Sequence, residues 1–213
     1  MNLQPNPNFE IRRKDLIKIV KKDHELHLSE FPYLPNHNWS QHHHKLHTIQ
    51  AVMTPSRDLI DLILELQSGK KMFHGNGDII SSTRKKEILD YIIKKVNPWR
   101  AENLDNYFHV FNDETYMDTN HIVLNNKIEH TKRDKVDFIG QFGLTSFKYF
   151  NKDGLASKLK GEEVRFNYPE NNRIARFSAD SGGAGLYCGR DPTYSDTELG
   201  VRTKFYSIDH LDK

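Results

Sequence analysis

Histidine is the residue type whose number first suggests chemistry in this chain. Twelve histidines occur, and seven of them lie within the first fifty residues. Imidazole can act as an acid, a base or a metal ligand near neutral pH. The three consecutive histidines at 42–44 lie in a segment of loop composition, so we expect a polar surface loop there. His24 and His27 have a spacing that permits metal ligation, but the segment misses an H-E-x-x-H motif by one residue, because only one residue separates Glu25 from His27.

His47 is a candidate acid or base. Residues 44–53 alternate between polar and apolar side chains, as is typical of a strand, with His47 on the same face as Ile49 and Met53. We therefore expect its ring at the edge of the core, where partial burial and the charge of Lys45 can tune its proton affinity. His47 is predicted to be catalytic and Lys45 to bind substrate.

A second candidate site depends on the register of one hairpin. If Asn125-Asn126 is a two-residue turn, His121 lies directly opposite His130 on the neighbouring strand. Their Cβ atoms would then be about 4.5–5.5 Å apart. Two imidazoles this close perturb each other's protonation and can serve as acid and base in phosphodiester chemistry without a metal. We predict His121 and His130 to be catalytic, although a slip of one residue would separate them.

A third candidate is the glycine-rich segment 178–189. Its run Ser-Gly-Gly-Ala-Gly at 181–185 is flexible enough to bring backbone N–H groups close to an anion. We expect a polar binding loop here, with an ordinary hairpin connection as the alternative. No Walker motif or dinucleotide fingerprint is present. The predicted substrate-binding residues around this segment are Arg173, Arg176, Arg190, Tyr187 and Tyr194.

The elements that position these residues change in type along the chain. Apolar spacing predicts helices over about 15–22, 55–68 and 82–96. Beyond residue 98, short aromatic and β-branched runs separated by turn residues predict strands. The expected fold is α+β, with the helices packed on a largely antiparallel sheet formed mostly by residues 106–208. We expect a single domain over residues 1–213, with residues 1–9 flexible.

Composition limits the function classes. The net charge of only +2 gives no strong indication of nucleic-acid binding. The single cysteine, Cys188, cannot form an internal disulfide, and one cysteine excludes a cysteine-rich metal site. We expect a cytoplasmic protein, because its first residues lack an apolar signal-peptide core and its apolar segments are too short to span a membrane.

The sequence supports two functional hypotheses. In the first, the protein is a metal-independent enzyme without a cofactor, acting on RNA, a nucleotide or another phosphorylated group. The three candidate histidines would transfer protons, and the three arginines would neutralise the phosphate. In the second, it is a non-catalytic binding module or inhibitor from a mobile element, contacting a protein or nucleic acid. The enzyme requires histidines and arginines around one pocket, whereas the binding module predicts a flat apolar or basic patch.

Overall fold

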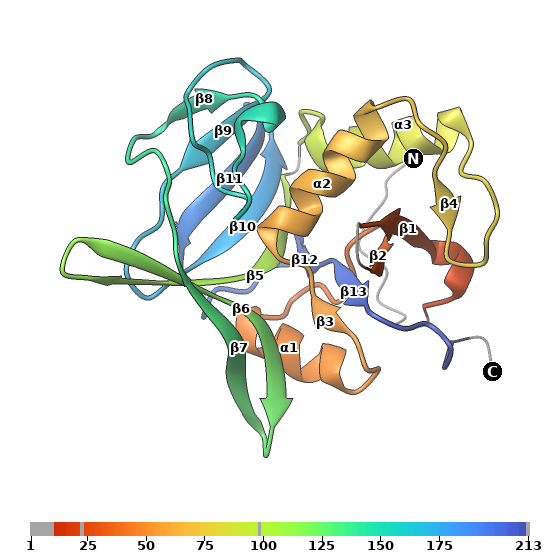
Figure 1. Ribbon diagram of the computed structural model, residues 1–213, viewed down its shortest axis with the longest axis horizontal. Coiled ribbons are helices and arrows are strands. Elements are labelled where there is room, and N and C mark those ends of the chain that lie inside the picture. The colour runs from red at the N-terminus through yellow and green to blue at the C-terminus, as the bar shows by residue number, and fades with distance from the viewer. Residues whose placement is uncertain (1–10, 22–23, 98, 212–213) are drawn as a thin grey trace.

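The protein is described from a computed structural model over residues 11–21, 24–97 and 99–211 (Figure 1). Its content of helix and strand is mixed, and strands dominate. The segment 1–9, expected to be flexible, lies outside the described residues. Within those residues, no helix is both long and apolar enough to cross a membrane.

The larger of two sheets is built by the second half of the chain. Its order is β7-β6-β5-β10-β11-β9-β8, with β12 beside β5. Most neighbours are antiparallel, but β9 runs parallel to β11 and β12 runs parallel to β5. The strands are β5 (Arg100–Phe111), β6 (Glu114–Leu124), β7 (Lys127–Lys135), β8 (Gly143–Thr145), β9 (Val164–Asn167), β10 (Arg173–Asp180), β11 (Gly183–Arg190) and β12 (Leu199–Val201).

A second sheet uses the N-terminal strands and the last strand of the chain, in the order β3-β13-β2-β1-β4. Its strands are β1 (Leu16–Val20), β2 (Glu25–Ser29), β3 (Val52–Met53), β4 (Phe73–His74) and β13 (Thr203–Phe205). The predicted helix over 15–22 is wrong, because Leu16–Val20 pairs antiparallel with β2. Leu16 and Ile17 are both fully buried although they point to opposite faces of the strand. A strand covered on both faces reads as a short continuous apolar run, which resembles a buried helix.

The helices within the described residues are α1 (Trp39–His47), α2 (Ser56–Gln67) and α3 (Ser82–Ile93), with short 3₁₀ turns η1 (Arg13–Asp15) and η2 (Phe147–Tyr149). The predictions of helices over 55–68 and 82–96 are confirmed, with slightly different ends. In Figure 1, α2 lies between the two sheets, and it packs against β5 and η2.

Helix α1 occupies the segment predicted to be a histidine-rich loop followed by a strand over 44–53. Both predictions are wrong there, since only Val52–Met53 is a strand. A capping box begins the helix. The side chain of Asn38 accepts a hydrogen bond from the backbone N–H of Gln41, and the side chain of Gln41 accepts one from the N–H of Asn38. The helix packs against β6 and β7.

Arg202 connects the two sheets. Its side chain is fully buried, and its Nε and Nη2 donate to the carboxylate of Glu102 on β5 at 2.9 and 3.1 Å. Its Nη1 donates to the carbonyl oxygens of Ser29 and Glu30, at the end of β2, at 2.5 and 2.6 Å. One guanidinium therefore satisfies polar groups of both sheets and holds the end of β2 against β5.

Candidate functional site

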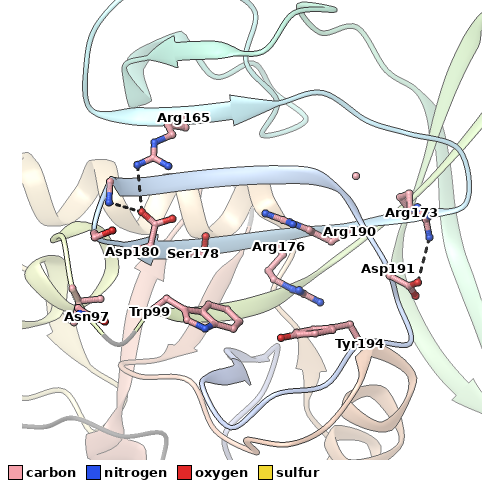
Figure 2. A pocket seen from close by; sticks show the side chains of 14 residues that line it. Asn97, Trp99, Arg165, Arg173, Arg176, Ser178, Asp180, Arg190, Asp191 and Tyr194 are labelled. Atoms are coloured by element: carbon pink, nitrogen blue, oxygen red, sulfur yellow. Dashed lines mark hydrogen bonds and ion pairs between the residues drawn. The ribbon is translucent and has the colours of Figure 1, made fainter.

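A pocket of about 910 Å³ opens on strands β9, β10 and β11 (Figure 2). Segments 96–97, 99 and 191–194 complete its wall. Its lining residues are Val96, Asn97, Trp99, Arg165, Arg173, Arg176, Ser178, Asp180, Ser181, Gly182, Gly189, Arg190, Asp191 and Tyr194. Three of the arginines, and Tyr194, are residues that the sequence predicted to bind substrate.

Both neighbours of β10 change register between Ile174 and Arg176. In a regular strand, residues three apart point to opposite faces. A local irregularity of this kind changes the direction of the side chains near it. Arg173 and Arg176 therefore both line the pocket although they are three residues apart.

The four arginines of the pocket differ in how their charges are neutralised. Nη2 of Arg165 lies 3.3 Å from Asp180, and Nη1 of Arg173 lies 3.6 Å from Asp191. Among the described residues, no carboxylate forms an ion pair with either of the other two, Arg176 and Arg190, within 4.0 Å. Two guanidinium groups on one concave surface therefore have no direct ion-pair partner among the described residues.

Arg176 is the most deeply placed of these cations, with 6% of the residue exposed. Its Nε donates to Oδ1 of Asn103 at 3.2 Å, and its guanidinium lies 5.0 Å from the ring centroid of Tyr194. Its Nη2 is buried and has no hydrogen-bond partner in the described part of the chain. Burial, and then the charge of Arg190, lower the pKa of Arg176 to about 10. An unpaired buried charge is costly, so this guanidinium favours the arrival of an anion.

A buried network fixes the direction of Arg176. The Nε2 of His42 lies 2.8 Å from the carbonyl oxygen of Leu34, and its Nδ1 lies 3.1 Å from Nδ2 of Asn103. Because a carbonyl only accepts, Nε2 carries the hydrogen and Nδ1 accepts from the amide of Asn103. The amide oxygen of Asn103 is then directed at Arg176. Burial lowers the pKa of His42 to about 3, so its ring stays neutral in this role.

Aromatic rings border the same pocket. Figure 2 shows the guanidinium of Arg176 over the ring of Tyr194, with Trp99 to the left and Arg190 above in this view. The hydroxyl of Tyr194 donates to Asp196 at 2.8 Å, which holds that ring in place. Tyr187, predicted to bind substrate, does not line the pocket. Its ring lies under Arg190, with the guanidinium 4.5 Å from the ring centroid.

The expected glycine-rich binding loop at 178–189 is instead a hairpin of β10 and β11, with residues 181–182 between the strands. The backbone N–H of Gly182 donates to the carboxylate of Asp180 at 2.7 Å and so is not free to bind an anionic ligand. A Cβ atom on Gly182 would overlap Nη2 of Arg165. The glycine therefore makes room for an arginine and does not form a phosphate cradle.

The register that placed His121 opposite His130 is confirmed. Asn125 and Asn126 form the turn with φ values of 49° and 61°, as a two-residue hairpin requires. The two histidines nevertheless interact with different carboxylates. Nδ1 of His121 lies 2.5 Å from Asp105, whereas Nδ1 of His130 lies 3.4 Å from Asp118.

His43, which was expected in a polar surface loop, is instead buried and joins His121. His43 extends from α1, and its Nε2 lies 3.6 Å from the same Asp105 oxygen. Burial lowers the pKa of His43 to about 4. The ring of Trp39 packs edge-on against both imidazoles, with centroid distances of 4.2 and 4.9 Å. The hairpin register had pointed to His121, and the sequence signal that could have added His43 is its spacing from Trp39, four residues away on one helix face.

The remaining predicted residues lie elsewhere. His47 and Lys45 are exposed on α1, because the expected strand is a helix and the predicted burial of His47 is wrong. None of the three predicted catalytic histidines is among the residues lining the arginine pocket. Sequence reasoning missed Arg165 and Trp99, whose places depend on the parallel pairing of β9 and on the chain path after α3.

Comparison of the chain with protein-family models, with curated proteins and with solved structures yields no match. The function is therefore inferred from the geometry of the arginine pocket and of the histidine cluster.

Proposed function

We propose that the protein binds a small phosphate-bearing molecule in the arginine pocket. The observation that carries this proposal is the buried guanidinium of Arg176, whose Nη2 has no partner among the described residues and on which the strongest charge effect, that of Arg190, is repulsive. A guanidinium desolvated in this way binds an oxyanion more strongly than an exposed one, because less water must be displaced and the local dielectric is low.

The charge pattern fits a ligand with more than one negative charge. Arg176 and Arg190 form no ion pair within 4.0 Å among the described residues, and Arg173 is only partly neutralised by an Asp191 that is itself exposed. Planar guanidinium groups bind phosphate oxygens through two parallel hydrogen bonds. The hydroxyl of Ser178, which lines the same wall, can add a further donor.

The size and the aromatic border favour a nucleotide within this class. Pockets for small molecules commonly enclose about 300–1,000 Å³, and the volume here lies within that range. Trp99 and Tyr194 offer ring faces beside the arginines, and a planar base can stack on such faces. The pocket is concave, so we favour a small molecule over the backbone of a nucleic-acid chain.

We infer binding without catalysis as the primary activity. The acid and base roles of His47, His121 and His130 stay predictions, and their positions outside the pocket lend them no support. We likewise propose that the protein belongs to the α+β class and that it is located in the cytoplasm. The proposal thus keeps the idea of a non-catalytic binding module, but its binding surface is a pocket for a phosphate-bearing molecule and not the flat apolar or basic patch expected from the sequence.

The experiment is a fluorescence titration with a panel of ligands. The chain has two tryptophans, and Trp99 lines the pocket whereas Trp39 lies in the histidine cluster. A nucleoside triphosphate and pyrophosphate should give saturable binding, an uncharged nucleoside should bind far more weakly, and Trp99→Phe should remove the nucleotide signal. Preference for a single-stranded oligonucleotide over the triphosphate would contradict a small-molecule site, as would the absence of binding by all phosphates.

A further inference from the structure

A second site lies outside the arginine pocket, where α1 meets the large sheet. His43 of α1, Asp105 of β5 and His121 of β6 present Nε2, Oδ1 and Nδ1, and all three atoms lie within 4.8 Å of one another. Their side chains are 2%, 0% and 6% exposed. We propose that these three residues bind a divalent transition metal of the zinc class.

The first argument is an orphaned polar atom. Nε2 of His43 is buried and has no hydrogen-bond partner in the described part of the chain. Its separation of 3.6 Å from Asp105 is too long for a hydrogen bond. Leaving a buried polar group unpaired is energetically unfavourable, so such groups are rare unless a ligand, ion or water completes them. The atom is directed at the carboxylate and at His121.

The second argument is the carboxylate itself. Asp105 is fully buried, yet no lysine or arginine of the described residues forms an ion pair with it. Its Oδ2 accepts the backbone N–H of His121 at 3.1 Å, which fixes the plane of the group. A cation between the two imidazoles would compensate this buried negative charge directly.

The spacing fits a small ion. Metal–ligand bonds of about 2.0–2.1 Å in a tetrahedral site place ligand atoms about 3.3–3.4 Å apart. The distance between His43 and Asp105 is already close to this, and the 2.5 Å distance between His121 and Asp105 must widen by less than an ångström. Ligation through Nδ1 of His121 requires that its hydrogen leaves, and the neutral ring then carries it on Nε2.

The ligand types select the metal class. Two imidazole nitrogens and one carboxylate oxygen suit zinc and its neighbours, whereas magnesium and calcium prefer sets made of oxygen alone. Trp39 packs against both imidazole rings, and its indole N–H donates to the carbonyl oxygen of Leu104 at 3.0 Å, so the ligand rotamers are fixed in advance. The ion would link α1 to the large sheet, and because His42 lies on the same helix, its position would also be restrained. The site departs from the expectation of a metal-free protein.

The test measures metal content of the full-length protein after it is stripped with a chelator and dialysed against Zn²⁺. One equivalent per chain is expected, and Co²⁺ should give the visible absorption of a tetrahedral nitrogen and oxygen site. His43→Gln and Asp105→Asn should each weaken Zn²⁺ affinity by more than about 100-fold, beyond the loss typical of outer-sphere partners. His47→Gln, an exposed histidine on the same helix, should bind as the unmodified protein does.

Far-UV circular dichroism establishes whether the variants fold. If the variants do not fold, the proposal is tested on the unmodified protein alone. Zn²⁺ should raise its Tm in proportion to the logarithm of the free metal concentration, and a chelator should reverse the rise. The proposal is overturned if the unmodified protein takes up no stoichiometric metal or shows no such shift. It is overturned equally if His43→Gln and Asp105→Asn retain full affinity, or if His47→Gln loses it, since the metal would then be bound at the surface.

Discussion

Arg176 and Asn103 are joined by a hydrogen bond of 3.2 Å from Nε to Oδ1, with the amide held on its other side by the neutral ring of His42. This chain of contacts runs from α1 through β5 to β10. These contacts hold the guanidinium of Arg176 in one orientation but leave its positive charge free. An arginine that binds an anion needs both properties.

Asn103→Asp should therefore weaken anion binding. The new carboxylate would form an ion pair with Arg176 and compete with the ligand for its charge. We expect the affinity for pyrophosphate to fall by about 10-fold or more, corresponding to about 1.4 kcal/mol. Fluorescence titration of Trp99 measures the change. Unaltered affinity would mean that Arg176 does not contact the ligand.

Arg176→Met should leave the empty protein as stable as before or stabilise it. The substitution removes a buried charge that lacks an ionic partner and keeps an apolar side chain of similar length. Replacement of buried charges by apolar residues is often neutral or stabilising by about 1–4 kcal/mol. Urea denaturation without ligand is the measurement. A loss of more than about 2 kcal/mol would indicate a structural role for the guanidinium.

Arg202→Met should have the opposite effect on stability. It would leave the buried carboxylate of Glu102 without its cation and two backbone carbonyls without donors. We expect a loss of about 3–5 kcal/mol in the free energy of unfolding. Arg57→Met is the control, because its ion pair with Asp61 is partly exposed and contributes about 1 kcal/mol or less. Similar losses in both variants would refute the linking role of Arg202.

The charge of Asp118 should make the stability of the protein depend on pH. Burial raises its pKa, but hydrogen bonds from Arg133 and His109, together with the nearby His130, outweigh burial and hold the pKa below its usual value of 3.8. The folded state therefore binds the proton less readily than the unfolded state, and the stabilisation is present above about pH 4 and lost as the pH falls through the folded pKa.

Asp118→Asn should accordingly cost about 1–3 kcal/mol at neutral pH, and this difference should shrink as the pH falls below about 4. Urea denaturation of both proteins across this range measures it. A difference that stays constant with pH would show that the carboxylate contributes through packing and not through its charge.

The parts of the fold that the sequence predicted correctly are those that neighbouring residues determine, such as helix starts and tight turns. The helix expected over 55–68 contains α2, which has Pro55 at its N-cap position, and the turn at Asn125-Asn126 sets the register that brings His121 opposite His130. The N-terminal sheet could not be predicted, because β1 is a short strand buried on both faces and β2 pairs with β13, which comes from the far end of the chain. Such long-range pairing leaves little trace in a short apolar run.

Part of the arginine pocket could be predicted, because some of its residues are close together in the sequence. Arg173, Arg176 and Arg190 cluster in sequence around one hairpin, so their convergence could be expected. Helix α1 was misread because it buries Trp39 and Leu46 alongside two histidines, His42 and His43, which a hydrophobic pattern counts as polar. The histidine network and the metal-binding geometry at Asp105 depend on that helix and were missed with it.

Calorimetric titration of pyrophosphate shows most directly whether Arg176 binds a phosphate. The unmodified protein should bind one equivalent in a saturable manner. Arg176→Gln should weaken the affinity by about 10- to 100-fold, as expected for a charge-assisted hydrogen bond. Lys127→Gln removes one exposed positive charge outside the pocket and should change the affinity by less than about 2-fold. Absence of saturable binding to the unmodified protein, or equal affinities for all three proteins, would mean that Arg176 is not a phosphate ligand.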